Sequence, residues 1–427
     1  MPWLAAVVLT LVLSAVPLNG QSHGEQSGTA TPDHQAPDQT VVLFPHQDAS
    51  GTAWVPEATP MYAVMKVWGG WQVMFHGNLV GQWLYEPGDR HRTGGFANEQ
   101  WSSPNWAMAL ARRPSAGGRL GLRAMVSAEQ WTVSDCGFLN YLATGEMCDG
   151  DTIHDRQHPH DLFMELGADY DRSLRGSLRW QVYGGLAGEP ALGPPGFPHR
   201  LSAMPNPIAP ISHHWLDSTH ITFGLVTTGL YTARWKAEAS VFNGREPDEN
   251  RADIDLAAFD SFSGRLSFLP TPRIAVQVSA GHLHEAEAEF APLPRSDVDK
   301  VTTSLMYQHE LADSGFWATT LAYAINSGRE FIGASGFDAT TQALLMETNL
   351  TLRERHAWFG RAEVVQKPAH DLHAHEYTTR IFTVGKLEAG YARYWNPWNS
   401  VATGIGGVVS LNIVCLLYTS PSPRDRG

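Results

Sequence analysis

Residues 71–85 have the sequence WQVMFHGNLVGQWLY, in which apolar and polar side chains alternate. The odd positions include Trp71, Phe75, Leu79 and Trp83, while the even positions carry Gln, His and Asn among others. Successive side chains of a β-strand point to opposite faces. The stretch therefore predicts a strand with one apolar face and one mostly polar face.

The same alternation recurs along the chain, and elsewhere its polar face carries charges. In residues 235–241, Trp235 and Val241 share one face, and Lys236 and Glu238 lie on the other. A soluble β-sandwich also alternates, but its core would not accept Lys, Arg, Asp and Glu. A closed sheet with hydrocarbon outside and water inside accepts them. The pattern therefore favours an all-β transmembrane barrel.

The spacing of these segments predicts an antiparallel up-and-down barrel of about 16 strands, and 14 to 18 strands fit the same pattern. Most connections alternate between short and long, as periplasmic turns and extracellular loops do in outer-membrane barrels. The expected strands are 71–85, 104–112, 119–129, 161–171, 176–186, 218–231, 235–243, 261–269, 273–283, 300–310, 315–326, 341–353, 357–365, 377–385, 387–395 and 401–414.

Length and charge narrow the class of protein. The 427 residues are enough for one large barrel, and 43 acidic residues against 30 basic ones give a net charge of −13. This balance argues against a nucleic-acid partner, because phosphates need basic patches. Beyond the N-terminus no run of about 18 apolar residues occurs, which excludes a helical membrane protein.

The chain divides into four expected parts. Residues 1–20 contain a short apolar stretch typical of a secretory signal peptide. Residues 21–60 are rich in Ser, Gly, Thr, Pro and Gln and predict a flexible periplasmic segment. Residues 61–414 form the expected barrel. Residues 415–427, CLLYTSPSPRDRG, resemble a translated sequencing adapter, and we expect a non-native tail there.

Two of the three cysteines, Cys136 and Cys148, lie in one expected long loop. An exported protein meets oxidising conditions, which favour disulfide formation. We therefore expect a Cys136–Cys148 disulfide.

Histidine is unevenly distributed, and it gathers in the expected external loops. Neutral imidazole suits Zn²⁺, Cu²⁺ and Ni²⁺, so a divalent metal site in these loops is one hypothesis. The alternative is that His–Asp pairs brace the loops. No other cofactor is expected. The candidate metal ligands are His154, His158, His160, His213, His214, His370, His373 and His375.

Charged residues of both signs occupy the face that would line the lumen. They would set a local field that filters solutes, or would hydrate and brace the wall. The expected pore-lining residues are Arg119, Arg123, Glu129, Asp161, Glu165, Asp169, Lys236, Glu238, Glu347, Arg353, Arg361 and Glu363.

A hydrolase is the enzymatic alternative, although we expect no enzyme. Ser218 and His220 are two residues apart and would share one face of a strand, with Asp217 beside them. However, the order Ser-x-His is the reverse of the His-x-Ser of outer-membrane phospholipase-type enzymes. No recognisable oxyanion partner accompanies the pair.

Across about residues 61–414 the chain resembles bacterial porin-like outer-membrane proteins, on its leader, its alternation and its loop rhythm, together with the stretch HDRQHPHDLFMEL at 154–166. The resemblance implies the outer membrane of a Gram-negative bacterium, contact with its lipid and, during biogenesis, with the barrel-assembly machinery. It is compatible with an oligomer. The leading hypothesis is passive transport of small polar solutes or ions through a channel. The alternatives are a copper- or zinc-handling outer-membrane protein and a lipid hydrolase.

Overall fold

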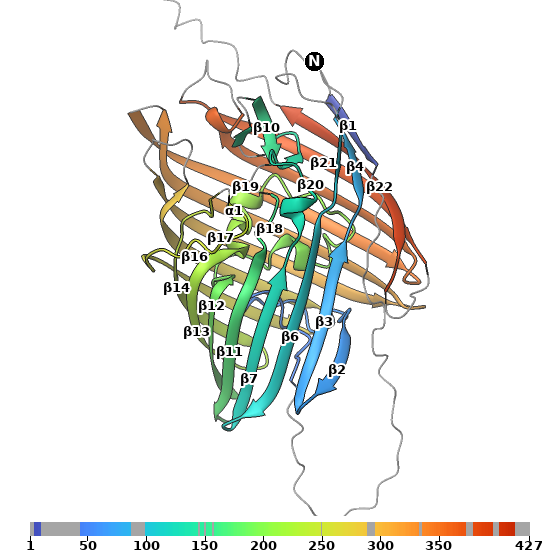
Figure 1. Ribbon diagram of the computed structural model, residues 1–427, viewed down its shortest axis with the longest axis vertical. Helices are drawn as coiled ribbons and strands as arrows, with labels where there is room; N and C mark the ends of the chain where they lie inside the picture. The colour runs from blue at the N-terminus through green and yellow to red at the C-terminus, as the bar shows by residue number, and fades with distance from the viewer. Residues whose placement is uncertain are drawn as a thin grey trace, which may run out of the picture.

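One curved β-sheet dominates the protein and surrounds an interior (Figure 1). The computed structural model describes residues 4–9, 43–86, 99–143, 146–148, 151–155, 158–248, 250–287, 295–332, 335–372, 379–395 and 401–414. No helix among these residues has both the length and the apolar character needed to cross a membrane.

The strands of the large sheet follow the chain in order. They are β1 (Leu4–Leu9), β2 (Val64–Trp68), β3 (Trp71–Leu79), β4 (Gln82–Tyr85), β5 (Glu99–Ser102), β6 (Asn105–Ser115), β7 (Gly118–Val126), β11 (Phe163–Arg175), β12 (Leu178–Gly188), β13 (Thr222–Tyr231), β14 (Trp235–Phe242), β15 (Ser261–Thr271), β16 (Ile274–Glu287), β17 (Ser296–Leu311), β18 (Gly315–Ile332), β19 (Ser335–Leu352), β20 (His356–Pro368), β21 (Ile381–Tyr394) and β22 (Gly404–Val414). A small sheet consists of β8 (Phe138–Leu139), β9 (Glu146–Cys148) and β10 (Asp151–Asp155).

Short helices lie between the strands. They are α1 (His213–Leu216) and the 3₁₀ helices η1 (Glu129–Trp131), η2 (Phe197–His199), η3 (Ser218–His220) and η4 (His370–Leu372).

From β11 to β22 each strand pairs antiparallel with the next, which confirms the expected all-β up-and-down order. The pair β3–β4 is one strand interrupted at residues 80–81, and β5–β6 is its interrupted partner. Counted in this way and without β1, the described sheet has sixteen antiparallel strands, as expected.

The two ends of the sheet do not pair with each other among the described residues. β2 pairs only with β3 at one edge, and β22 pairs with β21 near the other. Between them lies β1, which pairs with both β22 and β4. β1 belongs to the expected signal peptide, so the strands that follow residue 42 do not by themselves form a closed ring.

One expected turn is wrong. We expected two strands, 377–385 and 387–395, but residues 381–394 form the single strand β21. Lys386 is buried in mid-strand and pairs in register with Glu363 and Asn412. The alternation of exposed and buried side chains continues through it, and one residue is too short to reverse a strand. β2, which was not expected, restores the strand number.

Other strand boundaries differ by a few residues. β11 extends to Arg175, so the expected turn at 172–175 moves to residues 176–177. The expected loop 327–340 is mostly a long hairpin of β18 and β19. The expected strand 218–231 begins only at Thr222, because Ser218–His220 form η3. Each of these differences in strand boundary changes which residues belong to the wall of the barrel, that is, to its strands.

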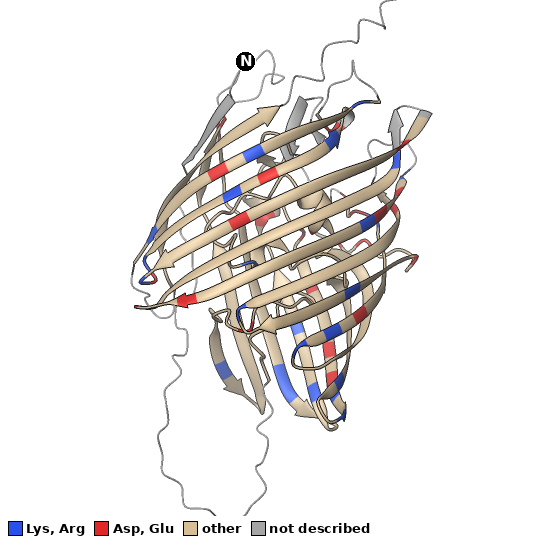
Figure 2. Ribbon diagram, turned by 180° about the vertical axis from the view of Figure 1, so that it is seen from behind, with Lys and Arg blue, Asp and Glu red and all other residues tan. Residues whose placement is uncertain are grey.

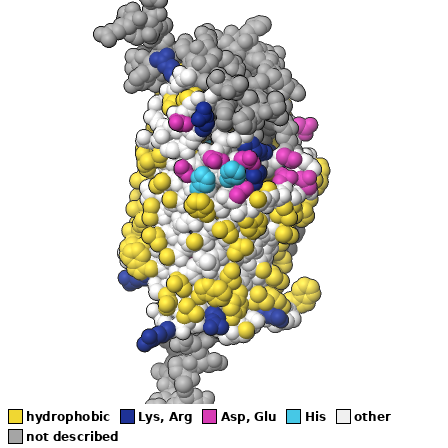
Figure 3. Space-filling view, turned by 90° about the vertical axis from the view of Figure 1, so that its left-hand side faces the viewer, with side chains coloured by type: hydrophobic (Ala, Val, Ile, Leu, Met, Phe, Trp, Pro, Cys, Tyr) yellow, Lys and Arg dark blue, Asp and Glu magenta, His cyan; other side chains and the backbone are white. Residues whose placement is uncertain are grey.

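The two faces of the wall differ in polarity, as the alternation predicts. In β14, Trp235 and Val241 are exposed, whereas Lys236 and Glu238 are buried on the inner face. Figure 2 shows charged residues at mid-length of several strands, not only at their ends. Figure 3 shows apolar side chains over one flank, between a zone in which Asp, Glu and His mix with Lys and Arg and a second zone of Lys and Arg. The exterior therefore suits lipid and the inner wall suits polar contents.

Two segments of the chain fill the interior. We call residues 43–60 the inner segment and residues 189–221 the inner loop; the latter connects β12 to β13 and carries η2, α1 and η3. Half of the residues of the inner segment and most of those of the inner loop are buried. We expected residues 21–60 to be a flexible lead-in, but their described part instead packs inside the sheet. Residues 1–3 and 10–42, which belong to the expected signal peptide and periplasmic segment, lie outside the described residues. So does the whole expected tail, 415–427.

Candidate functional site

The inner segment is held by cationic side chains of the wall. Arg112 on β6 donates from Nη1 to the carbonyl oxygen of Leu43 at 2.9 Å. Arg123 on β7 donates from Nη1 to the carbonyl oxygen of Gly51 at 2.6 Å. Further contacts of this kind join Asp48 to Arg112, Thr52 to Lys236 and Arg265, and Trp54 to Lys236. The wall therefore binds backbone carbonyls as well as a carboxylate.

The inner loop crosses the interior and contacts the opposite wall. Arg200 donates from Nε to Glu347 Oε1 on β19 at 2.6 Å, and from Nη1 to Asp217 Oδ2 at 2.5 Å. Ser212 donates from its backbone N–H and its hydroxyl to Glu363 on β20. Other polar contacts join Asn206 to Glu388, Ile208 to Arg361, Leu201 to Asn349 and Trp215 to Thr341. Polar groups thus attach the loop to three wall strands and their neighbours.

The inner loop also meets the inner segment. Ser50 donates from its hydroxyl to Glu189 Oε2 at 2.6 Å, and Arg265 lies 3.8 Å from Glu189 Oε1. Burial raises the pKa of the Glu189 carboxyl to about 8, against the lowering effects of Arg265 and Ser50. The carboxyl is therefore protonated at neutral pH, unlike an exposed glutamate.

Most of the expected pore-lining residues face the interior, but their side chains are buried by other parts of the protein and are not exposed to water. Arg119, Arg123, Glu129, Asp161, Glu165, Lys236, Glu238, Glu347, Arg361 and Glu363 are all buried, and Asp169 is half-buried. Several pair with each other along the wall: Arg123 with Asp169 and Glu165, Lys236 with Glu238, and Arg361 with Glu347. The inner segment and inner loop supply many of their remaining partners.

Arg353 does not line the interior, and its expected position was wrong. It lies in the turn between β19 and β20, with a φ of 53°. Its side chain is exposed, and its Nε lies 3.8 Å from Oδ2 of Asp313 in the turn between β17 and β18. The expected strand 341–353 overran the true end of β19 at Leu352.

The histidines expected as metal ligands fall into three groups. His158, His160 and His213 come together inside the barrel. The ring centre of His214 lies 6.1 Å from that of His213, and His214 is outside the group of ligand nitrogens that lie within 4.8 Å of one another. His373 and His375 lie outside the described residues, and the side chains of His154 and His370 are not described either. The cluster gains His220, which was not among the expected metal ligands.

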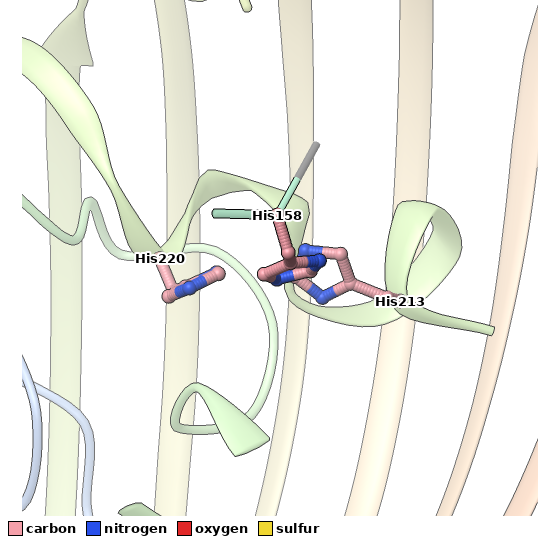
Figure 4. A group of neighbouring side chains, drawn as sticks. All are labelled: His158, His213 and His220. Carbon is pink, nitrogen blue, oxygen red and sulfur yellow. The ribbon is translucent and has the colours of Figure 1, made fainter. Parts of the chain in front are cut away.

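We call His158, His160, His213 and His220 the imidazole cluster. Ligand nitrogens of His158, His213 and His220 lie within 4.8 Å of one another (Figure 4). His160 adjoins them, with its ring centre 4.6 Å from that of His158 and 5.3 Å from that of His220. Phe197 packs against all four rings.

Hydrogen bonds fix the orientation of three of these rings. Nδ1 of His213 lies 2.8 Å from Asp217 Oδ1, and Nδ1 of His160 lies 2.8 Å from Glu129 Oε2. Nδ1 of His220 lies 2.8 Å from the carbonyl oxygen of Asp217. Since a carboxylate or carbonyl accepts, these Nδ1 atoms carry the proton and each Nε2 presents a lone pair.

The His213 and His220 rings are uncharged at neutral pH. Burial lowers the pKa of His213 to about 4, although Asp217 opposes this shift. Burial and the neighbouring imidazoles also lower the pKa of His220. Neutral rings are the form that can coordinate a metal ion.

Three cavities adjoin one another in the interior. The largest, about 170 Å³, lies between the inner segment and the wall and includes His76, Trp106 and His199 in its lining. The second, about 60 Å³, and the third, about 40 Å³, share His158 and His160, and the third shares Trp106 with the first. The described interior therefore contains three small neighbouring cavities, each of which has histidines in its lining.

The geometry does not support a lipid hydrolase. Ser218 and His220 lie on η3 in the inner loop and not on the lipid-facing side of a strand. The Ser218 hydroxyl accepts from Lys300 Nζ at 2.6 Å, and His220 Nδ1 faces a backbone carbonyl. A lipid in the membrane would be separated from this pair by the barrel wall.

Cys136 is disulfide-bonded, as the expected Cys136–Cys148 pairing requires. It lies between η1 and β8, in the long connection that leads to the imidazole cluster at His158. The bridge therefore restrains a segment that reaches the cluster.

No known protein family and no curated protein matches the chain. Among solved structures it is similar to OmpF of Salmonella typhi in complex with daunomycin, at 10% identity and a TM-score of 0.46, over 82% of this chain and 100% of that one. It is also similar to the anion-selective porin from Comamonas acidovorans, at 8% identity and a TM-score of 0.43, over 80% and 100% of the two chains.

A third similar structure is the outer membrane channel DcaP of Acinetobacter baumannii, at 11% identity and a TM-score of 0.34, over 82% of this chain and 99% of that one. The strand order, the apolar exterior and the charged inner wall are those of a porin-like outer-membrane β-barrel.

Proposed function

We propose that this protein is a channel of the bacterial outer membrane that passes small polar solutes or ions. In the conformation described here, the inner segment and the inner loop close the channel. Passage then requires that one or both of them move aside. Outer-membrane lipid and the barrel-assembly machinery remain the partners predicted from the sequence.

The observation that carries this proposal is the polar character of the contacts between the filling segments and the wall. Arg112, Arg123 and Lys236 hold the inner segment through backbone carbonyls, and Glu347 and Glu363 hold the inner loop. Because these bonds involve charged groups, exchanging one of them for bonds to water costs about 1.5–3 kcal/mol. Because these contacts are polar, water can replace them when the inner segment or the inner loop moves away from the wall.

A purely structural core would be held differently. Apolar cores gain most of their stability from buried hydrocarbon, about 25 cal/mol per Å². Here, in contrast, the wall that meets the filling segments carries ionisable residues on most strands from β6 to β21. Burying so many ionisable side chains would destabilise an ordinary apolar core. The same side chains suit an interior that water can enter.

The test is single-channel recording in planar bilayers with refolded protein. We compare the intact chain, a variant lacking residues 43–60, and Arg123→Ala, with Arg245→Ala as the control because Arg245 pairs with Asp260 and Glu285 away from the inner segment. We expect small or brief current steps from the intact chain and larger, longer ones from the deletion and Arg123→Ala. Arg245→Ala should match the intact chain.

The absence of current steps from both the intact chain and the deletion variant would overturn the proposal. The barrel must be shown to be folded in that case, by strand content in circular dichroism and by heat-modifiable migration in gels.

A further inference from the structure

We propose that His158, His213 and His220 bind one divalent transition-metal ion, Zn²⁺ or Cu²⁺, inside the barrel. Three separate segments bring these ligands together: the connection before β11, the helix α1 and the 3₁₀ helix η3 (Figure 4). Their ligand nitrogens lie within 4.8 Å of one another. The proposal does not depend on whether the barrel conducts.

The first argument is the orientation of the rings. His213 and His220 are both tied through Nδ1 to Asp217, one to its side chain and one to its carbonyl oxygen. Metal-binding histidines commonly donate their second ring N–H to a carboxylate or carbonyl, which fixes the ring and aims the other nitrogen at the ion. Asp217 therefore orients two of the three ligands.

The second argument is an unsatisfied nitrogen. Nε2 of His220 is buried and has no hydrogen-bond partner among the described residues, and the same is true of Nε2 of His160. Leaving a buried polar group without a partner costs about 1–3 kcal/mol. If the cluster only packed against Phe197, nothing would offset this free-energy cost. A bound metal ion would offset it by accepting the lone pair of the nitrogen.

The third argument concerns the identity of the ion. Three neutral imidazoles are a donor set that Zn²⁺ and Cu²⁺ accept, whereas Ca²⁺ and Mg²⁺ prefer oxygen. Zn–N bonds of about 2.0–2.1 Å in a tetrahedron place the nitrogens about 3.3 Å apart, so small ring rotations complete the site. The cavity of about 60 Å³ beside the cluster, lined by Ser218 and Lys300 among others, leaves room for water as a further ligand.

The fourth argument links the site to the wall. Asp217 accepts from Arg200 at 2.5 Å, and Arg200 donates to Glu347 at 2.6 Å. Asp217, which would not touch the metal ion, is thus a positioning residue held from the opposite wall. Loss of such a group typically lowers metal affinity 10- to 100-fold.

The experiment is equilibrium dialysis of the refolded full chain against ZnSO₄, with the bound metal measured by mass spectrometry. A His282→Ala/His284→Ala background removes the exposed group formed by these residues and Asp297. In this background, His158→Gln, His213→Gln and His220→Gln should each abolish one equivalent of tightly bound Zn²⁺. Asp217→Asn should lower the affinity for that equivalent 10- to 100-fold. His356→Gln, at the start of β20 and outside the imidazole cluster, should leave it unchanged.

A spectroscopic measurement separates coordination from a structural effect. With CuSO₄ as the probe, electron paramagnetic resonance of the background chain should show coupling to three nitrogens, and each His→Gln variant that retains copper should show fewer. Unchanged Zn²⁺ stoichiometry in all three variants, or a copper signal that does not change with any of them, would overturn the proposal. Circular dichroism confirms that each variant is folded.

Discussion

Arg200 in the inner loop and Glu347 on β19 form a buried ion pair, with 2.6 Å between Nε and Oε1. The two side chains are 0% and 1% exposed. The Arg200 guanidinium also binds Asp217, so one cation joins the wall to the residue that orients the imidazole cluster. The position of the inner loop and the geometry of the cluster therefore depend on the same contact.

Replacement of Arg200 should destabilise the barrel strongly. Arg200→Ala removes the guanidinium from Asp217. It leaves Glu347 with the longer contact to the Arg361 guanidinium at 3.6 Å. Removal of one partner from a buried pair costs about 3–5 kcal/mol. The measurement is urea-induced unfolding of the refolded protein in detergent, followed by tryptophan fluorescence. Arg245→Ala removes pairs that are partly exposed and should cost less than about 1 kcal/mol. Equal effects of both variants would contradict this interpretation of Arg200.

Stability should fall as the pH rises, through Glu189. The pKa of its carboxyl is raised from 4.5 to about 8 by burial, so the folded state holds a proton that the unfolded state releases. The stabilisation is complete below pH 4.5, declines as the pH rises through about 8, and then levels off. Unfolding midpoints in urea measured from pH 7 to 9 should show this decline, because the buried histidines, whose lowered pKa makes stability rise with pH, act mainly below this range.

The control for Glu189 is Glu189→Gln, which retains a polar partner for Ser50 and cannot titrate. Its midpoint should lose the part of the pH dependence that Glu189 causes. A wild-type chain and a Glu189→Gln variant with the same slope would show that another group is responsible.

Gly193 should not tolerate a side chain. Its φ is +77°, and a Cβ there would lie 2.1 Å from the carbonyl oxygen of Leu216 in α1. We expect Gly193→Ala to cost more than about 2 kcal/mol and to displace α1. Gly176 also has a positive φ but has open space around it, so Gly176→Ala should cost only about 1 kcal/mol. Unfolding in urea compares the two, and a smaller loss for Gly193→Ala would refute the contact.

Peptide mapping under non-reducing conditions should recover a peptide that joins Cys136 to Cys148. In the chain-entropy model such a short bridge contributes roughly 3 kcal/mol. Reduction should therefore make the connection around residues 127–162 easier to cleave with protease before the rest of the barrel. A Cys136 peptide joined to Cys415 instead would contradict the expected pairing.

The sequence predicts much of the wall, because a strand side chain has only two directions available. The alternation from Trp71 to Tyr85 and from Trp235 to Val241 assigns each residue to the outer or inner face before any partner strand is known. Errors occur at strand ends. Arg353 was misplaced because the alternation does not mark where a strand ends. Lys386 was taken as a turn, although the alternation continues through it and β21 is a single strand.

Only the tertiary structure decided what occupies the interior. Residues 43–60 have the composition of a flexible lead-in, yet the cations Arg112, Arg123 and Lys236 bind their carbonyl groups. His158 is separated from His213 and His220 by more than 50 residues, and no local pattern relates His158 to the other two. Period-two alternation is a property of neighbouring residues, whereas the filling of a lumen depends on contacts between residues that are distant in sequence.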